Sequence, residues 1–297
     1  MKKLLQVLLV LLIIASAAGV VMVAWHSGTI IGQMVDVRVE PTISWPLGAA
    51  ERVQALDVPT EGDIALHAWH LEAPEPQGLV ILLHGMHGMA ASSMVHFGLP
   101  LQEQGYEVFA LDMRAHGRSG GDEIGLAYTE VNDVVHLLNW LQTDSNYREL
   151  PITLIGHSMG GATAINTAAV RPDVAKVVSI SGFASFEETF VDVLRSEAVP
   201  EPIVYLYRLG VRLQLWRRYG LNPVVQAPLR QVSAVTQPLL LIHGDADEQI
   251  DVRQARMLHS EQPEAELWLI PDGRHDVIQQ VFFDEPWRQQ LLAFLAR

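Results

Sequence analysis

One serine in the sequence lies in a setting that suits nucleophilic chemistry. It is Ser158, in the string GHSMG at positions 156–160, which has the form G-x-S-x-G. The apolar run ITLIGHS precedes the turn and the small-residue helical pattern GGATAINTAAV follows it. A serine on such a strand–turn–helix bend has a strained backbone that directs its hydroxyl outward, and flanking glycines relieve crowding. This context favours a nucleophile over the alternative, a chance glycine-rich turn.

A histidine near the C-terminus is the best candidate for the base that such a serine needs. A serine hydroxyl is a poor nucleophile at neutral pH, and histidine suits the task because its pKa lies near working pH. Of the twelve histidines, His275 lies in the turn PDGRHD, directly after the apolar run ELWLI. A loop in that place would bring the imidazole to the same sheet edge as Ser158. The alternative is an exposed loop histidine without a role.

Two aspartates could orient the histidine and stabilise its charged form. Asp245 and Asp247 both lie in the string HGDAD, which follows the apolar run PLLLI. With either one, the chain order is Ser, Asp, His, one of the orders in which such a catalytic set occurs. On the residues alone, both aspartates remain candidates.

An earlier glycine-rich turn is suited to binding an oxyanion. The string HGMHG at positions 84–88 ends an apolar run. A tetrahedral intermediate needs two hydrogen-bond donors. We expect the backbone N–H groups of Met86 and Met159 to supply them. His84 and His87 could instead suggest a metal site, but no third ligand stands at a helpful spacing, so neither a metal nor a cofactor is expected.

The elements that must position these residues alternate between short apolar runs and helical patterns. This alternation is typical of a largely parallel sheet covered by helices. The first two strands are expected to pair antiparallel. Strands are expected over residues 51–58, 63–72, 78–84, 106–112, 152–158, 176–182, 238–244 and 266–273, and helices over 93–104, 130–142, 160–170 and from about 284 to the C-terminus.

One stretch departs from the alternation. Residues 184–236 contain no strand-like run, and their pattern predicts helices with many apolar and aromatic side chains. We expect a helical cap inserted over the carboxyl ends of the strands, where open α/β sheets bind ligands. The apolar character of this cap is compatible with a lipid-like substrate and equally with ordinary packing against the core. His116 and Ser119 are expected to structure a nearby loop, and His157 and Asp112 to be structural.

The composition excludes several classes of protein. The 297 residues carry a formal net charge of −14 and no cysteine. Nucleic acid is not an expected partner, because binding a phosphate backbone needs a basic patch. Disulfides, thiolate metal sites and cysteine nucleophiles are ruled out. The oligomeric state is not indicated by the sequence.

The N-terminus has the features of a targeting or anchoring segment. Lys2 and Lys3 precede an apolar run from Leu4 to Trp25, which as a helix would span about 33 Å, enough for a bilayer core. The lysines favour a cytoplasmic N-terminus with the catalytic body on the far side. The alternative is a signal peptide cleaved after Ala15-Ser16-Ala17, leaving a secreted or periplasmic protein. The expected organisation is an anchor or signal peptide over 1–27, a linker over 28–50 and a catalytic domain over 51–297.

Taken together, six ordered segments resemble the α/β-hydrolase superfamily, in particular its serine hydrolases such as monoglyceride lipases, bacterial carboxylesterases and prolyl-aminopeptidase-like enzymes. The segments are LLHGMHG, LDMRAHGRSGG, the helix ending in NWL, LIGHSMGG, LIHGDADEQI and IPDGRHD. The resemblance implies an α/β-hydrolase fold, often with a helical cap. It also selects Asp247 as the acid, three residues after the glycine of HG-x-x-D. The family often has a small or aromatic residue where Met86 stands.

The leading functional hypothesis is therefore a serine hydrolase that cleaves a small-molecule carboxylic ester, with a lipid-like ester or acylglycerol as one candidate, through an acyl-enzyme. Thioester or amide hydrolysis and acyl transfer, on the same three residues, are alternatives within the class. A membrane-anchored binding protein without catalysis is the alternative outside it, and the complete set Ser158, Asp247 and His275 argues against it.

Overall fold

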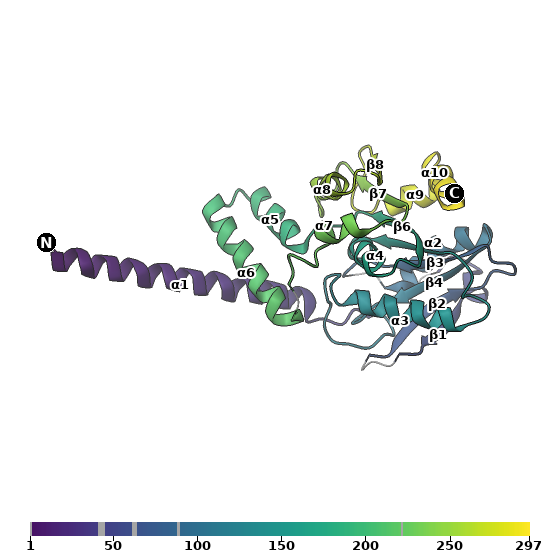
Figure 1. Cartoon of the computed structure of the whole chain (residues 1–297), viewed down its shortest axis with the longest axis horizontal. Helices are drawn as coiled ribbons and strands as arrows, with labels where there is room; N and C mark the ends of the chain where they lie inside the picture. The colour runs from purple at the N-terminus through teal and green to yellow at the C-terminus, as the bar shows by residue number, and fades with distance from the viewer. Residues whose placement is uncertain (1, 41–44, 61–63, 88–89, 221) are drawn as a thin grey trace.

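The computed structural model describes residues 2–40, 45–60, 64–87, 90–220 and 222–297. Its centre is an eight-stranded sheet with the order β1-β2-β4-β3-β5-β6-β7-β8 (Figure 1). The strands β3 to β8 are parallel, whereas β2 is antiparallel to both of its neighbours, β1 and β4. The strands are β1 (Gln54–Val58), β2 (Leu66–Leu71), β3 (Gly78–Leu83), β4 (Tyr106–Asp112), β5 (Ile152–His157), β6 (Val174–Ile180), β7 (Leu239–Gly244) and β8 (Glu266–Ile270).

Helices cover both faces of this sheet, as its buried strands require. Along β3, Leu79 and Ile81 point into one hydrophobic core and Val80 and Leu82 into the other. Helices α3, α4 and α8 pack on the first face, and α2, α9 and α10 on the second. Their bounds are α2 (Ala91–Glu103), α3 (Glu130–Thr143), α4 (Met159–Val170), α8 (Arg253–Glu261), α9 (Ile278–Phe283) and α10 (Trp287–Ala296).

The α/β-hydrolase fold, with its opening antiparallel pair and parallel strands, is the fold that the sequence predicts. Two helices were not predicted, α8 and α9. The final helix also begins later than expected, at Trp287, because Pro286 separates it from α9. Asp63 of the predicted strand 63–72 and Gly88 of the HGMHG string lie outside the described residues.

The insertion after β6 begins with a helical hairpin, α5 (Phe186–Ser196) and α6 (Glu201–Tyr219). Ser185 caps α5 by accepting a hydrogen bond from the Glu188 N–H, and Gly220 ends α6 in the left-handed conformation. The last part of the predicted cap packs against the α/β domain. Helix α7 (Pro228–Gln231) and the turn η2 (Val232–Ala234) bury Pro228 and Val232 against it. The short turn η1 (Ala49–Glu51) precedes β1.

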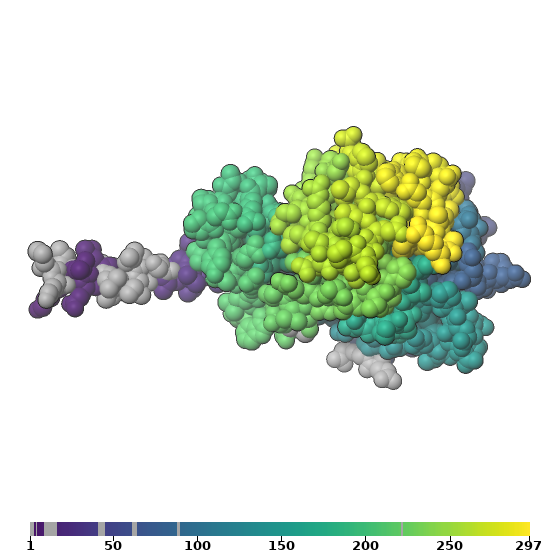
Figure 2. Space-filling view, turned by 45° about the horizontal axis from the view of Figure 1, so that its top comes forward, coloured from purple at the N-terminus to yellow at the C-terminus, as the bar shows by residue number. Residues whose placement is uncertain are grey.

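The N-terminal helix α1 (Lys2–Val35) is longer than the predicted anchor. Its first part projects away from the body, and its last turns lie beside α6 (Figures 1 and 2). Ile31 and Val35 are fully buried in the same core as β3 and α3. Residues 28–35, expected to belong to a linker, are therefore helical and packed.

Candidate active site

The strand-to-helix turn between β5 and α4 holds Ser158 in a strained conformation. Its φ is 54° and its ψ is −118°, in a region that non-glycine residues rarely adopt. Only glycine fits two residues before and two residues after Ser158, at positions 156 and 160. A Cβ at Gly156 would lie 2.1 Å from the carbonyl oxygen of Gly160, and a Cβ at Gly160 would lie 2.2 Å from that of Leu83. This turn therefore has the geometry of a nucleophile elbow.

The structure brings the three predicted side chains together at the carboxyl edge of the sheet. Ser158 follows β5, Asp247 follows β7 and His275 follows β8. The Oγ of Ser158 lies 3.0 Å from Nε2 of His275, and Nδ1 of His275 lies 2.8 Å from Oδ2 of Asp247. When Nδ1–H donates to the carboxylate, Nε2 is free to accept the serine proton.

The carboxylate of Asp247 is buried and fully hydrogen-bonded. Its side chain has no exposed surface. Oδ1 accepts the backbone N–H groups of Gln249 and Ile250, each at 2.9 Å. Burial acts to raise the pKa of Asp247, but hydrogen bonds from His243, His275 and the Ile250 amide outweigh it and hold the pKa well below its usual range. The carboxylate is thus ionised at any working pH and faces the imidazole. Asp245, by contrast, is exposed.

The loops that carry Asp247 and His275 are joined directly. The N–H of Ala246 donates to the Gly273 carbonyl at 3.0 Å. A Cβ at Gly244 would lie 2.1 Å from that same carbonyl oxygen, so the close approach of the two loops requires glycine there. This contact sets the register between the acid and the histidine.

Two further histidines support the site, and the sequence analysis did not assign them these positions. The Nε2 of His157 donates to the backbone carbonyl of His275 at 2.8 Å. The Nε2 of His243 lies 2.8 Å from the Ile250 carbonyl and 3.3 Å from Oδ2 of Asp247. Each stands near the end of a strand and close in sequence to a candidate residue. His157 directly precedes Ser158, and His243 lies four residues before Asp247. That adjacency is the signal that could have found them.

The predicted oxyanion donors lie beside the serine. Met86 and Met159 both line the pocket that contains Ser158 and His275. Met159 is the first residue of α4, where backbone N–H groups have no partner within the helix. Their role as oxyanion donors stays a prediction.

Other residues singled out in the sequence hold the neighbouring loop. Asp112 accepts hydrogen bonds from the N–H groups of Ala91 and Arg118 and faces the ring of His67 at 3.1 Å. The hydroxyl of Ser119 donates to the Asp112 carbonyl, and His116 hydrogen-bonds the Arg114 carbonyl. Burial lowers the pKa of His116 to about 3, so its ring is neutral. These residues have the structural roles expected of them.

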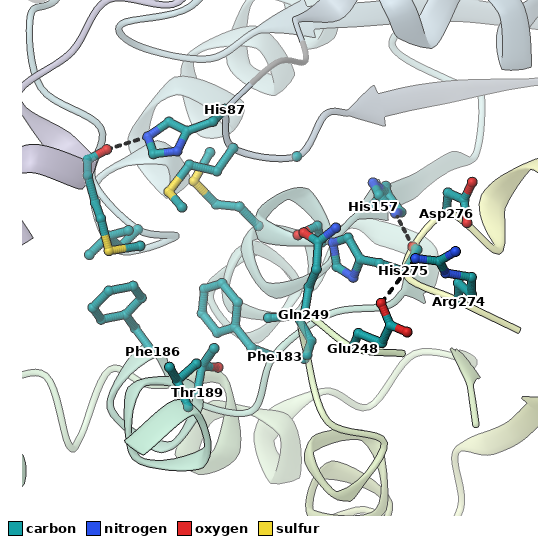
Figure 3. A pocket seen from close by; sticks show the side chains of 18 residues that line it. His87, His157, Phe183, Phe186, Thr189, Glu248, Gln249, Arg274, His275 and Asp276 are labelled. Carbon is teal, nitrogen blue, oxygen red and sulfur yellow. Dashed lines mark hydrogen bonds and ion pairs between the residues drawn. The ribbon is translucent and has the colours of Figure 1, made fainter. Parts of the chain in front are cut away.

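The pocket around Ser158 has a volume of about 680 Å³ and two chemically different sides (Figure 3). Phe183 and Phe186 lie on one side of His275, and Arg274 and Asp276 on the other. In the described residues, no group of three or more side chains is arranged to hold a metal ion. The lining residues are Met34, Gly85, Met86, His87, Leu126, His157, Ser158, Met159, Phe183, Phe186, Thr189, Val193, Glu248, Gln249, Ile250, Arg274, His275 and Asp276.

Comparison with known proteins agrees with this fold. An esterase of Pyrococcus furiosus, Pf2001, superposes with a TM-score of 0.68 at 24% identity, over 88% of this chain and 98% of its own. A monoacylglycerol lipase of Mycolicibacterium smegmatis is 28% identical over 249 residues, covering 73% of this chain and 86% of that protein. An uncharacterized membrane protein of Saccharomyces cerevisiae is 25% identical over 257 residues, covering 81% of this chain and 84% of that protein.

The chain belongs to the α/β-hydrolase superfamily. Within that superfamily, the family model described as serine aminopeptidase, S33, matches residues 74–211. By this match and by the lipase relative, the chain is similar to serine hydrolases of the esterase and lipase type.

Proposed function

We propose that this protein hydrolyses carboxylic esters through an acyl-enzyme, as a carboxylesterase or lipase-like enzyme. Ser158 is the nucleophile, His275 the general base and Asp247 the residue that orients the imidazole. The observation that carries the proposal is the continuous hydrogen-bonded series from the Ser158 hydroxyl through His275 to Asp247, at 3.0 and 2.8 Å.

In the acylation step, the Ser158 Oγ attacks the acyl carbon while Nε2 of His275 takes its proton. The Met86 and Met159 amides stabilise the oxyanion of the tetrahedral intermediate. The imidazolium, stabilised by the buried carboxylate of Asp247, then protonates the leaving alcohol. In the deacylation step, His275 removes a proton from water while the water oxygen attacks the acyl carbon. The imidazolium then returns this proton to Ser158 Oγ as the bond between Oγ and the acyl carbon breaks and the acid leaves. The nucleophile, the base, the acid and the oxyanion donors in this cycle are all groups of the chain.

The pocket supports an ester with an apolar acyl group. The apolar side chains Phe183 and Phe186 form one side. The polar residues Glu248 and Arg274, which pair at 3.0 Å, lie on the other. A lipid-like ester has this division into an apolar acyl chain and a polar alcohol, and one relative is named a monoacylglycerol lipase.

Amide hydrolysis is the second candidate, because the matching family model is described as a serine aminopeptidase. The same residues would serve, with His275 protonating a leaving amine. Parallel assays of p-nitrophenyl esters, acyl-CoA thioesters and aminoacyl-arylamides separate the reactions. We expect esters to be turned over fastest, and Ser158→Ala to reduce that rate by about a million-fold. Turnover of the arylamides alone would contradict the esterase assignment.

We further propose that α1 anchors the protein in a membrane with the catalytic domain, residues 51–297, outside the cytoplasm. Among the described residues, one stretch of α1, Ala17–Val35, is long and apolar enough to cross a bilayer. Since its last turns are buried in the body, the proposed membrane segment is the apolar run Leu4–Trp25 at the start of the helix. The neighbouring helix α6 also exposes apolar side chains, as expected close to a lipid surface. These side chains are Ile203, Tyr205, Leu209, Leu213 and Trp216.

The membrane proposal is tested by fractionation of cells that produce the full chain. We expect the protein to stay in the membrane pellet after alkaline carbonate extraction and to start at its own N-terminus. A soluble protein starting at Ala18 or nearby, after the predicted cleavage site, would instead establish a signal peptide.

A further inference from the structure

One residue of the pocket wall comes from the N-terminal helix. Met34, in the last turn of α1, lines the same pocket as Ser158 and Phe186. The segment that the sequence marks as an anchor therefore continues into the wall of the candidate active site.

The end of α1 is fixed in place from several directions. Ile31 and Val35, on either side of Met34, are fully buried. The Val35 carbonyl accepts the N–H of Ile124 at 2.9 Å, and the Met34 carbonyl accepts a hydrogen bond from Nε2–H of His87. The backbone of Met34 is thus held on both sides, while its own side chain is only partly buried and borders the pocket.

The cap helix α6 is clamped to the same part of α1. Gln214 donates to the Ala24 carbonyl at 2.8 Å, and Arg218 forms two hydrogen bonds with Asp36, at 2.6 and 2.8 Å. In the same region, helices α1 and α6 approach each other so closely that a Cβ at Gly210 would lie 2.6 Å from the Ser27 hydroxyl oxygen. These contacts begin at Ala24, after the predicted cleavage site, so this wall is the same whether α1 is an anchor or a cleaved signal peptide.

The chemistry of the pocket wall indicates which part of an ester meets Met34. An apolar acyl chain should lie against Phe183 and Phe186, and the more polar alcohol on the opposite side of His275, where Arg274 and Asp276 stand (Figure 3). His87, whose ring contacts the Met34 carbonyl, lies on this apolar side.

We infer that Met34 is a specificity-determining residue that closes the acyl side of the pocket and limits the length of the acyl chain. The inference rests on the proposed ester hydrolysis. An unbranched thioether adapts its shape to a flexible chain. Shortening the side chain at position 34 should admit longer acyl groups, whereas a bulkier side chain should favour shorter ones.

The test measures kcat/KM for p-nitrophenyl esters from acetate to dodecanoate in two opposite variants. We expect Met34→Ala to raise the decanoate-to-butyrate ratio about tenfold, and Met34→Phe to lower it by a similar factor, since a few methylenes in an apolar pocket give discrimination of this size. Gln33→Ala is the matched control, because Gln33 is exposed on the same turn of α1. It should leave the ratio unchanged.

A second measurement separates this inference from the proposed function. Fluorophosphonates with short and long alkyl chains report access to Ser158 without needing turnover. A shift of the labelling preference towards long chains in Met34→Ala supports the inference even if the natural substrate is not an ester. Wild-type preferences retained by both Met34 variants, in a labelled and folded protein, would overturn it. Absence of any labelling in the wild type would instead defeat the proposed function itself.

Discussion

The ring of His157 donates its Nε2–H to the backbone carbonyl of His275, 2.8 Å away, and so joins the residue before the nucleophile to the loop that carries the base. His157 is buried, and burial lowers its pKa to about 4. The ring is therefore neutral at working pH and acts as a fixed donor rather than as a proton carrier.

Loss of this donor should misplace the base without removing it. We expect His157→Leu to lower kcat by about ten- to a hundredfold, with little change in KM, because small displacements of a catalytic group have effects of this size. His157→Gln, which keeps a side-chain donor, should recover part of the rate. Steady-state kinetics on a p-nitrophenyl ester check this. Equal rates in wild type and His157→Leu would show that the hydrogen bond does not position His275.

Removal of the charge at Asp247 should be far more damaging. The buried carboxylate receives Nδ1–H of His275, and an amide at this place would favour the wrong tautomer. We expect Asp247→Asn to reduce kcat by about 10⁴-fold. The matched control is Asp245→Asn, two residues away and exposed, which should keep nearly the full rate. A large loss in the control and a small one in Asp247→Asn would mean that the acid has been assigned to the wrong aspartate.

The elbow should not tolerate a methyl group at Gly156. A Cβ there would lie only 2.1 Å from the Gly160 carbonyl oxygen. The backbone of the turn must therefore shift, and we expect this strain to lower the free energy of unfolding by about 3 kcal/mol. We expect Gly156→Ala to lose both ester turnover and several degrees in thermal midpoint. The same substitution at Gly19, where nothing lies within 4 Å of the added atom, should change neither. Thermal melts with activity assays on both variants give the comparison.

A buried glutamate should make stability depend on pH. Burial, together with the charge of Asp133, raises the pKa of Glu130 from 4.5 to about 7. Between these values the unfolded chain ionises this group first, so stability is complete below the unfolded pKa and falls as pH rises through the folded one. The loss by pH 8 is about 3 kcal/mol.

Glu130→Gln removes this titration. Urea unfolding at pH 5 and pH 8 should show that the variant loses less stability than the wild type over this interval. Parallel changes in the two proteins would mean that Glu130 does not titrate in this range.

The nucleophile elbow and the base could be predicted from the sequence, because each is marked by the strands and helices that directly precede or follow it in the chain. Ser158 lies between an apolar strand and a small-residue helix, and His275 directly follows a strand. The choice between Asp245 and Asp247 could not be made in this way. It depends on burial, which arises only when the loop after β8 closes on the loop after β7 through Gly244 and Gly273. Resemblance to the family supplied that choice.

The packing of the N-terminal helix against the body is not predicted, because its apolar run has the features of a membrane anchor or a signal peptide, which the fold does not include. The sequence after Trp25 holds the evidence that it continues. Ile31, Met34 and Val35 stand at helical spacing, among small and polar residues, as in a helix with one buried face. The sequence does not show what this buried face packs against. In the structure it packs against α6 and against the hydrophobic core of the body.

The most direct test of the account is the site at which a fluorophosphonate reacts. The intact wild-type protein is labelled, digested and mapped by mass spectrometry, alongside Ser158→Ala and His275→Ala. One adduct per chain on the peptide that contains Ser158, absent from the first variant and formed far more slowly in the second, is the predicted result. An unlabelled wild type, or an adduct that persists when Ser158 is replaced, would contradict the proposed nucleophile.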